Sequence, residues 1–265
     1  MISLARALAF VLAASVGTLA FGQAQKAPAP PVYEPSVGQE GKDVVWVPTP
    51  QAVVNKMLDM ARVTKNDFVM DLGSGDGRTV ITAAKRGARA HGVEYNPDMV
   101  ELSQHNAEKE GVAARATFEK ADLFETDFSK ATVITMFLLP EINLKLRPQI
   151  LKLTPGTRVV SNTFTMGDWQ ADETATISSK GGCNNSWCTA LLWIVPAQVA
   201  GTYQIPQGEL MLRQNYQVLS GTLRTGGASP TTYAISGKVR GEEITFKAGG
   251  RDYRGRLNGK QLELK

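Results

Sequence analysis

An acidic residue followed by three alternating glycines is the part of the sequence whose residue types and spacing could do chemistry. Asp71 precedes Gly73, Gly75 and Gly77, and Glu94 follows 21 residues after Gly73. Glycine lets the backbone turn sharply and lets a ligand approach without meeting a Cβ. Backbone N–H groups at a helix start can bind a carboxylate or a phosphate. The turn therefore predicts a cradle for a nucleotide-type ligand, and Asp71 suits a positively charged group on that ligand.

The elements that must position these residues alternate between strand and helix. Apolar runs bounded by Gly and Pro predict strands at 68–72, 88–94, 117–123, 132–139 and 156–164, with helices at 79–86, 98–110 and 144–153 between them. This alternation predicts an α/β fold with a doubly wound, mostly parallel Rossmann-like sheet. Ligands bind at the carboxyl ends of such strands. Asp71, Glu94, Asp122 and the segment 137–140 are expected to meet at that edge.

The glycine spacing separates two kinds of nucleotide site. The dinucleotide fingerprint G-x-G-x-x-G would place its third glycine where this chain has Arg78. The observed pattern instead resembles motif I of the class I, seven-strand S-adenosylmethionine (SAM) methyltransferases. That resemblance implies SAM as the cofactor. Asp71 and the loop would hold its methionine end, Glu94 its ribose and Asp122 its adenine amino group, while Tyr95 or Leu123 packs the ring. The loop residues so implied are Gly73, Ser74, Gly75 and Gly77.

Five segments narrow the resemblance to one group of methyltransferases. They are Trp46-Val47-Pro48-Thr49-Pro50, residues 71–78, residues 92–97, Phe137-Leu138-Leu139-Pro140 and Gly167-Asp168-Trp169. Together they resemble the family that includes the ATP-synthase c-subunit and adenine-nucleotide-translocase lysine methyltransferases. A protein lysine is therefore the implied acceptor class.

The acceptor slot is expected at the end of the fourth strand. Phe137 and Pro140 are the candidates for its wall, and Trp46 and Trp169 are expected behind them. Pro48 and Thr49, in the same segment as Trp46, are also candidate acceptor-site residues. Plain core packing is the alternative for these apolar side chains. No residue is identified as a general base, and His91 is interpreted as structural. The Asn/Asp-Pro-Pro-Tyr motif is absent, which argues against DNA adenine methylation, and no nucleic-acid partner is expected.

The two ends of the chain differ from this central part. Residues 1–24 resemble a secretory signal peptide, with an uncleaved membrane anchor as the alternative. A Pro- and Ala-rich linker is predicted over 25–43, and the methyltransferase domain over 44–195. From residue 196 to 265, short alternating segments punctuated by Gly, Asn and Ser predict an antiparallel β meander of about six strands. Because of the signal-like residues 1–24, periplasmic or secreted export is expected.

Charge and cysteine content bear on the partners. The 265 residues carry a net charge of +4, and residues 201–265 hold ten Lys or Arg against five Asp or Glu. This local excess could favour an acidic partner or a membrane surface, with a scattered solvated face as the alternative. Cys183 and Cys188 are predicted to form a disulfide across a short turn in an oxidising compartment. The two histidines lack ligand spacing, so no metal site is predicted.

Two other classes of function remain open. A nicotinamide-dependent oxidoreductase would use the same strand, turn and helix, but the third dinucleotide glycine is missing. An exported, non-catalytic binding protein on a methyltransferase scaffold would account for a SAM fold outside the compartment where SAM is made. The intact set of Asp71, Glu94 and Asp122 favours the enzyme. The sequence leaves the oligomeric state open.

Overall fold

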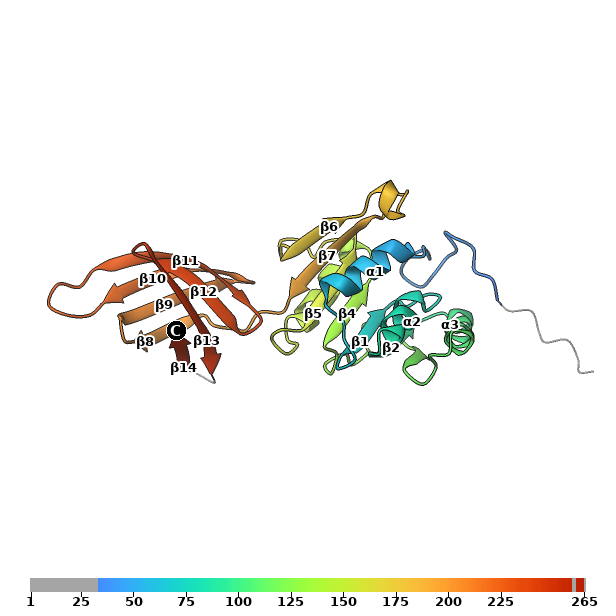
Figure 1. Ribbon diagram of the computed structural model, residues 1–265, viewed down its shortest axis with the longest axis horizontal. Helices are drawn as coiled ribbons and strands as arrows, with labels where there is room; N and C mark the ends of the chain where they lie inside the picture. The colour runs from blue at the N-terminus through green and yellow to red at the C-terminus, as the bar shows by residue number, and fades with distance from the viewer. Residues whose placement is uncertain (1–32, 259–260, 265) are drawn as a thin grey trace, which may run out of the picture. The chain divides into compact units, whose positions relative to one another are not determined.

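A computed structural model describes residues 33–258 and 261–264, and two β-sheets follow one another along this part of the chain (Figure 1). The predicted signal peptide and residues 25–32 of the predicted linker lie outside the described residues. None of the helices in the described ranges is long and apolar enough to cross a membrane.

The first sheet has the strand order β3-β2-β1-β4-β5-β7-β6. Strands β1 to β5 run parallel, whereas β7 is antiparallel to both β5 and β6. The strands are β1 (Phe68–Leu72), β2 (Arg89–Glu94), β3 (Ala116–Lys120), β4 (Val133–Met136), β5 (Arg158–Asn162), β6 (Glu173–Thr176) and β7 (Thr189–Ile194). The helices are α1 (Gln51–Met60), α2 (Arg78–Lys85), α3 (Pro97–Lys109) and α4 (Pro140–Ile150). The predicted doubly wound, mostly parallel sheet is confirmed.

Hydrophobic clusters lie on both faces of this sheet. One contains the buried side chains of α1, α2 and α3, and the other contains those of α4. Neighbouring strand residues such as Val133 and Ile134 belong to opposite clusters, because successive side chains of a strand point to opposite faces. The helices therefore cover both faces and leave the carboxyl edge of the strands for a site.

Several element boundaries differ from the sequence expectation. The helix after β4 begins at Pro140, several residues before the predicted start at 144. Proline is well suited to the first helical turn, since it needs no backbone hydrogen-bond donor there. Strands β6 and β7 were not predicted. The side chains of β6 are largely exposed and polar, so its sequence carries no apolar period of two.

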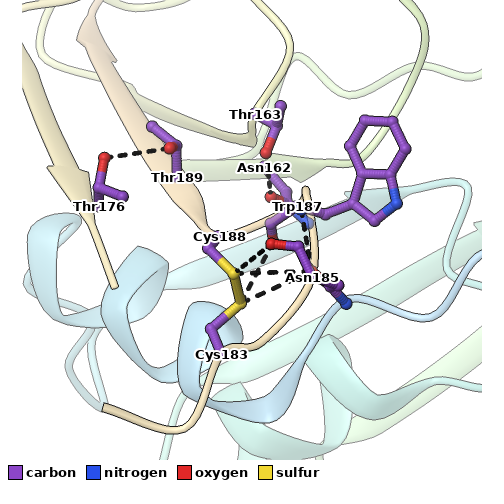
Figure 2. Close-up of a disulfide and its surroundings, with 8 residues drawn as sticks. All are labelled: Asn162, Thr163, Thr176, Cys183, Asn185, Trp187, Cys188 and Thr189. Carbon is purple, nitrogen blue, oxygen red and sulfur yellow. Dashed lines mark hydrogen bonds between the residues drawn. A yellow bond between two sulfur atoms is a disulfide. The ribbon is translucent and has the colours of Figure 1, made fainter. Parts of the chain in front are cut away.

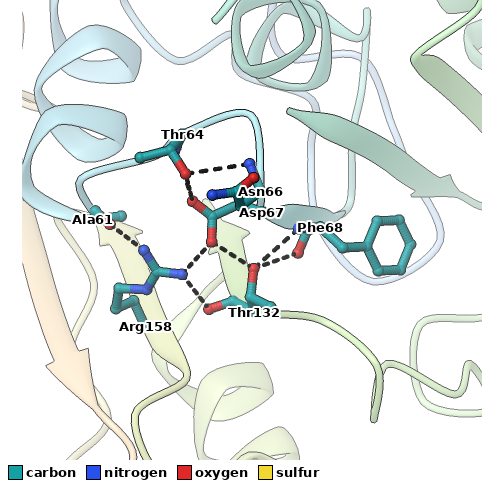
Figure 3. A network of polar contacts seen from close by, with 7 residues as sticks. All are labelled: Ala61, Thr64, Asn66, Asp67, Phe68, Thr132 and Arg158. Carbon is teal, nitrogen blue, oxygen red and sulfur yellow. Dashed lines mark hydrogen bonds and ion pairs between the residues drawn. The ribbon is translucent and has the colours of Figure 1, made fainter. Parts of the chain in front are cut away.

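An ion pair between buried Asp67 and half-buried Arg158 ties together the amino ends of the central strands (Figure 3). Arg158 at the start of β5 bonds the carboxylate of Asp67, and its other guanidinium nitrogen donates to the Ala61 carbonyl at 2.8 Å. The Thr132 hydroxyl and the Thr64 amide each donate to Asp67 at 2.8 Å. Burial alone would raise the pKa of Asp67, but these hydrogen bonds outweigh it and hold that pKa below its usual value. The network stabilises the edge of the sheet opposite the expected site.

The second sheet is an antiparallel meander, which we call the β module. Its strands are β8 (Gly201–Ile205), β9 (Gly208–Asn215), β10 (Val218–Thr225), β11 (Thr232–Arg240), β12 (Glu243–Ala248), β13 (Arg251–Asn258) and β14 (Gln261–Leu264). They pair in sequence order, and β14 contacts β8, so the sheet curls towards a closed barrel. A third hydrophobic cluster, separate from those of the first sheet, fills its inner face. The predicted meander is confirmed, with seven strands rather than about six.

Candidate active site

A cavity lies at the carboxyl ends of β1, β2 and β4, where the sequence predicted a ligand. The predicted residues that line it are Trp46, Pro48, Thr49, Asp71, Gly73, Ser74, Gly75, Glu94, Tyr95, Asp122, Leu123 and Phe137. Three others are placed elsewhere. Gly77 precedes α2 as its N-cap, Pro140 is the first residue of α4, and Trp169 is fully buried in the core.

The glycine loop is closely packed on its inner side. A Cβ on Gly75 would lie 2.7 Å from the Trp46 indole nitrogen, and one on Gly77 would lie 2.8 Å from the Phe118 ring. Both residues have left-handed φ angles, of 54° and 82°. A side chain at either position would therefore clash and strain the backbone, so the glycines are required by this local structure.

The N–H groups of this loop are largely used within the protein. Those of Gly73 and Ser74 donate to the Val93 carbonyl at 2.9 Å, and that of Gly75 donates to the Glu94 carboxylate at 3.0 Å. The N–H of Gly77 donates to the Ser74 carbonyl. These donors do not form the open phosphate cradle that the sequence alone allowed. The cavity lining includes the carboxylates of Asp71, Glu94 and Asp122, whereas Lys42 and Arg78 are paired with Asp122 and Asp76. This lining suits a cation rather than a pyrophosphate.

Asp71 is the most perturbed acidic group of the cavity. Its side chain is buried at the end of β1, and Thr135 of β4 donates a hydrogen bond to it at 2.5 Å. Burial raises the pKa of Asp71 to about 7; the charges of Asp76 and Glu94 add to this effect and the Thr135 hydrogen bond opposes it. Its strongest neighbours are hydroxyls and carboxylates rather than a cation. The ammonium of a bound methionine moiety would supply the missing positive charge.

Glu94 and Asp122 line the cavity further from β1. Glu94 already accepts hydrogen bonds from the N–H groups of Gly75 and Asn96, each at 3.0 Å, which fix its carboxylate in place. Asp122 lies in the turn after β3, because that strand ends at Lys120 rather than at the predicted residue 123. The Lys42 ammonium bonds Asp122 and lies 4.8 Å from the Tyr95 ring centroid. This hydrogen bond lowers the pKa of Asp122 and keeps it ionised.

Sequence reasoning missed the residues that connect the N-terminal segment to the cavity. Residues 39–49 line it, and Lys42 is their link to Asp122. Arg78 pairs with Asp76 and donates to the Thr49 carbonyl at 3.0 Å, which ties the same segment to the glycine loop. In the sequence analysis, Arg78 mattered only because it stands where the third glycine of the dinucleotide fingerprint would be. Its role depends on a contact across 29 residues, which no local pattern indicates.

The expected acceptor slot is only partly assembled from the predicted side chains. Phe137 is half-buried and lines the cavity. Trp169 is instead packed against Trp193 and Tyr216, with ring centroids 6.2 Å and 5.9 Å away. Trp169 thus belongs to the core on the α4 face, and it does not reach the cavity.

Cys183 and Cys188 form a disulfide in the structure (Figure 2). Both half-cystines are buried and pack within the hydrophobic cluster on the α1 face. Trp187 lies between them in sequence and is half-buried. In the part of the chain that the structure describes, no group of three or more His, Cys, Asp or Glu side chains could hold a metal ion.

The cavity fits S-adenosylmethionine better than a dinucleotide. A buried carboxylate lies at the end of β1, a fixed carboxylate follows at the end of β2, and a third lies after β3. Asp71, Glu94 and Asp122 are therefore the residues that would hold the ammonium, the ribose hydroxyls and the adenine amino group.

Comparison with known proteins supports the same cofactor. Residues 71–173 match the family model described as the ANTKMT methyltransferase domain. The chain is 44% identical over 155 residues to a protein-lysine N-methyltransferase of Saccharolobus islandicus, covering 57% of this chain and 94% of that protein. It is 35% identical over 128 residues to the human lysine N-methyltransferase of the ATP synthase c-subunit, covering 48% of this chain and 54% of the human protein.

A solved structure extends the likeness to the bound cofactor product. An RNA methyltransferase from Salinibacter ruber, in complex with S-adenosyl-L-homocysteine, is 45% identical to this chain, with a TM-score of 0.53. The alignment covers 58% of this chain and 96% of that one. The order of the first sheet, the acidic groups around its cavity and these relatives agree. The chain is a SAM-dependent methyltransferase of class I and belongs to the family of the adenine-nucleotide-translocase and ATP-synthase c-subunit lysine methyltransferases.

Proposed function

We propose that this chain methylates the ε-amino group of lysine side chains in a protein acceptor. The observation that supports this most directly is the 44% identity to a protein-lysine N-methyltransferase over 94% of that protein's length. The chain spans only about half of the human relative, so its own acceptor is part of the proposal.

The chemistry requires positioning rather than a strong catalytic group. When bound, SAM supplies a methyl group on a sulfonium; the amine lone pair forms the N–CH₃ bond as the S–CH₃ bond breaks, and a proton leaves to solvent. Asp71 and Glu94 both line the cavity and would hold and orient the donor there. The acceptor lysine must be neutral to react, so its ammonium loses a proton to solvent before the methyl group is transferred.

RNA is the second acceptor class, because the Salinibacter ruber structure carries that description at 45% identity. The segment after β4 is Phe137-Leu138-Leu139-Pro140, without the polar motif of adenine methyltransferases, which argues against adenine as the acceptor. The test incubates the purified chain with methyl-labelled SAM and either a protein extract or total RNA. Label recovered as methyl-lysine after acid hydrolysis supports the proposal, and label recovered only in nucleosides refutes it.

We also propose that the chain is exported. The support is the signal-like sequence of residues 1–24 and a buried disulfide, which persists in oxidising compartments. Mass spectrometry of the protein from its native host should find a new N-terminus near residue 25 and no free thiol. An intact Met1 with two free thiols would contradict export.

The division of the chain near residue 195 is a further part of the proposal. The clusters of the first sheet and that of the β module share no residues, which supports two folding units over 44–195 and 196–265. Contacts nevertheless cross the boundary: Gln217 donates to the Gln170 carbonyl at 2.7 Å, and Tyr216 stacks on Trp169. We assign acceptor presentation to the β module, with a purely structural cap as the alternative.

A further inference from the structure

Three aromatic rings gather at the carboxyl edge of the first sheet, next to the cavity. The ring centroids of Phe137 and Phe164 are 5.7 Å apart, and the Trp187 ring lies 5.7 Å from Phe137 and 5.3 Å from Phe164. All three side chains are half-buried, so each keeps part of its surface open to solvent. Because Phe137 also lines the cofactor cavity, this aromatic cluster adjoins that cavity.

The backbone at the end of β5 is strained where it turns Phe164 into the cluster. Thr163 has a φ of 60°, a left-handed conformation that a β-branched residue rarely adopts. The turn is held by Asn143 of α4, which is fully buried and donates to the Thr165 carbonyl at 3.1 Å. Such strain persists only when surrounding contacts enforce it, and it concentrates at functional sites. The position of Phe164 is therefore enforced by its surroundings.

The position of Trp187 depends on the disulfide loop (Figure 2). Cys183 and Cys188 anchor the loop in the core, and the backbone N–H of Trp187 donates to the Asn185 side chain at 2.9 Å. The Ile177 N–H donates to the Cys188 carbonyl at 2.8 Å, which fixes the end of the loop to the strand region. The disulfide thus restrains the short segment that carries the third ring.

We propose that Phe137, Phe164 and Trp187 form the surface that receives the acceptor lysine side chain, and that the Cys183–Cys188 disulfide holds Trp187 in this surface. This inference rests on the proposed protein-lysine methylation and names its acceptor subsite. Phe137 is kept from the sequence prediction, and Phe164 and Trp187 take the place of Trp169 and Pro140. The sequence analysis did not relate these two residues to the acceptor slot.

The chemistry of lysine and of its methylated forms fits this surface. The hydrocarbon stem of the lysine side chain packs on aromatic faces, which removes its apolar surface from water. Methylated ammonium groups are attracted by the negative faces of aromatic rings, with Trp the strongest. The cluster would therefore bind mono- and dimethyl-lysine as well as lysine, and would retain the acceptor for further methylation.

The kinetic test uses the full chain, purified without reductant. Trp187→Ala should raise the acceptor KM at least about fivefold, the scale of one lost cation–π contact. The value of kcat and the affinity for S-adenosylhomocysteine should stay within about twofold of the unaltered chain. A contact that stabilises the bound acceptor equally in the ground state and the transition state affects KM and leaves kcat unchanged. Trp187→Phe should restore most of the KM, and the Cys183→Ser/Cys188→Ser double variant should resemble Trp187→Ala. Phe68→Ala is the matched control, because Phe68 is a half-buried aromatic residue at the amino end of β1, at the edge of the sheet opposite the site.

A binding test separates this inference from the proposed function. N-acetyl-Nε-trimethyl-lysine methylamide is titrated by NMR or calorimetry, with its uncharged tert-butyl analogue as the comparison. Binding that prefers the cation and is lost in Trp187→Ala supports the aromatic surface, even if no protein lysine is methylated. Equal titrations of the unaltered chain and folded Trp187→Ala would overturn it, as would an unchanged acceptor KM in an active enzyme.

Discussion

The raised pKa of Asp71 predicts that cofactor affinity depends on pH. The carboxyl is buried, and its pKa in the ligand-free protein is about 7. If only the carboxylate pairs with the cofactor ammonium, binding requires loss of this proton. Affinity should therefore rise as pH increases towards 7 and level off above it. Asp122 is held ionised by Lys42 and does not supply this dependence.

The expected magnitude follows from the ionised fraction. With a pKa of about 7, roughly 3% of Asp71 is ionised at pH 5.5 and roughly 76% at pH 7.5, so the affinities should differ about 25-fold, or about 2 kcal/mol. The measurement is calorimetry with S-adenosylhomocysteine across this range. Asp71→Asn, which cannot ionise, should bind weakly and without this dependence. A flat profile in the unaltered chain would refute the assignment of Asp71 to the ammonium.

The same group has a signature in stability. Because its pKa is raised in the folded protein, Asp71 contributes stability that is fully present below its unfolded value near 3.8 and is lost as pH rises through about 7. Cofactor binding should offset this loss, because the ammonium stabilises the carboxylate. The gain in Tm on adding S-adenosylhomocysteine should therefore be larger at pH 7.5 than at pH 5.5.

Three further predictions concern other parts of the chain. Glu94→Ala should weaken S-adenosylhomocysteine binding by about 1.5–3 kcal/mol in calorimetry, as for a lost charged hydrogen bond, and an unchanged affinity would exclude the ribose role. Asp67→Asn leaves the half-buried Arg158 without its charge partner, so denaturant unfolding should show a loss of about 1.5–3 kcal/mol, as for a lost charged hydrogen bond. In the unaltered chain the Asp67 contribution is present near neutral pH and is lost as acidification passes its lowered pKa. Truncation after Pro196 should retain S-adenosylhomocysteine binding but lower Tm, because Trp169 loses its packing with Tyr216; a folded truncation that no longer binds would contradict the division.

The sequence by itself determined the cofactor half of the site. Asp71, the glycine turn and Glu94 belong to consecutive elements, so their spacing along the chain reports their spacing in the fold. A strand, a tight turn and a helix leave few geometries, and the left-handed φ angles that require glycine lie within that one turn. The same locality accounts for the β module, whose strands pair with their neighbours in sequence, whereas β1 of the first sheet also pairs with β4.

Only the tertiary structure decided the acceptor side and the supports of the site. Phe137, Phe164 and Trp187 come from three elements, and their meeting depends on β7 pairing antiparallel with β5, which no local period indicates. The sequence placed Trp169 behind the acceptor slot, but packing against Trp193 and Tyr216 buries it in the core. Long-range contacts such as that of Lys42 with Asp122 join residues whose separation along the chain carries no information about their distance in space.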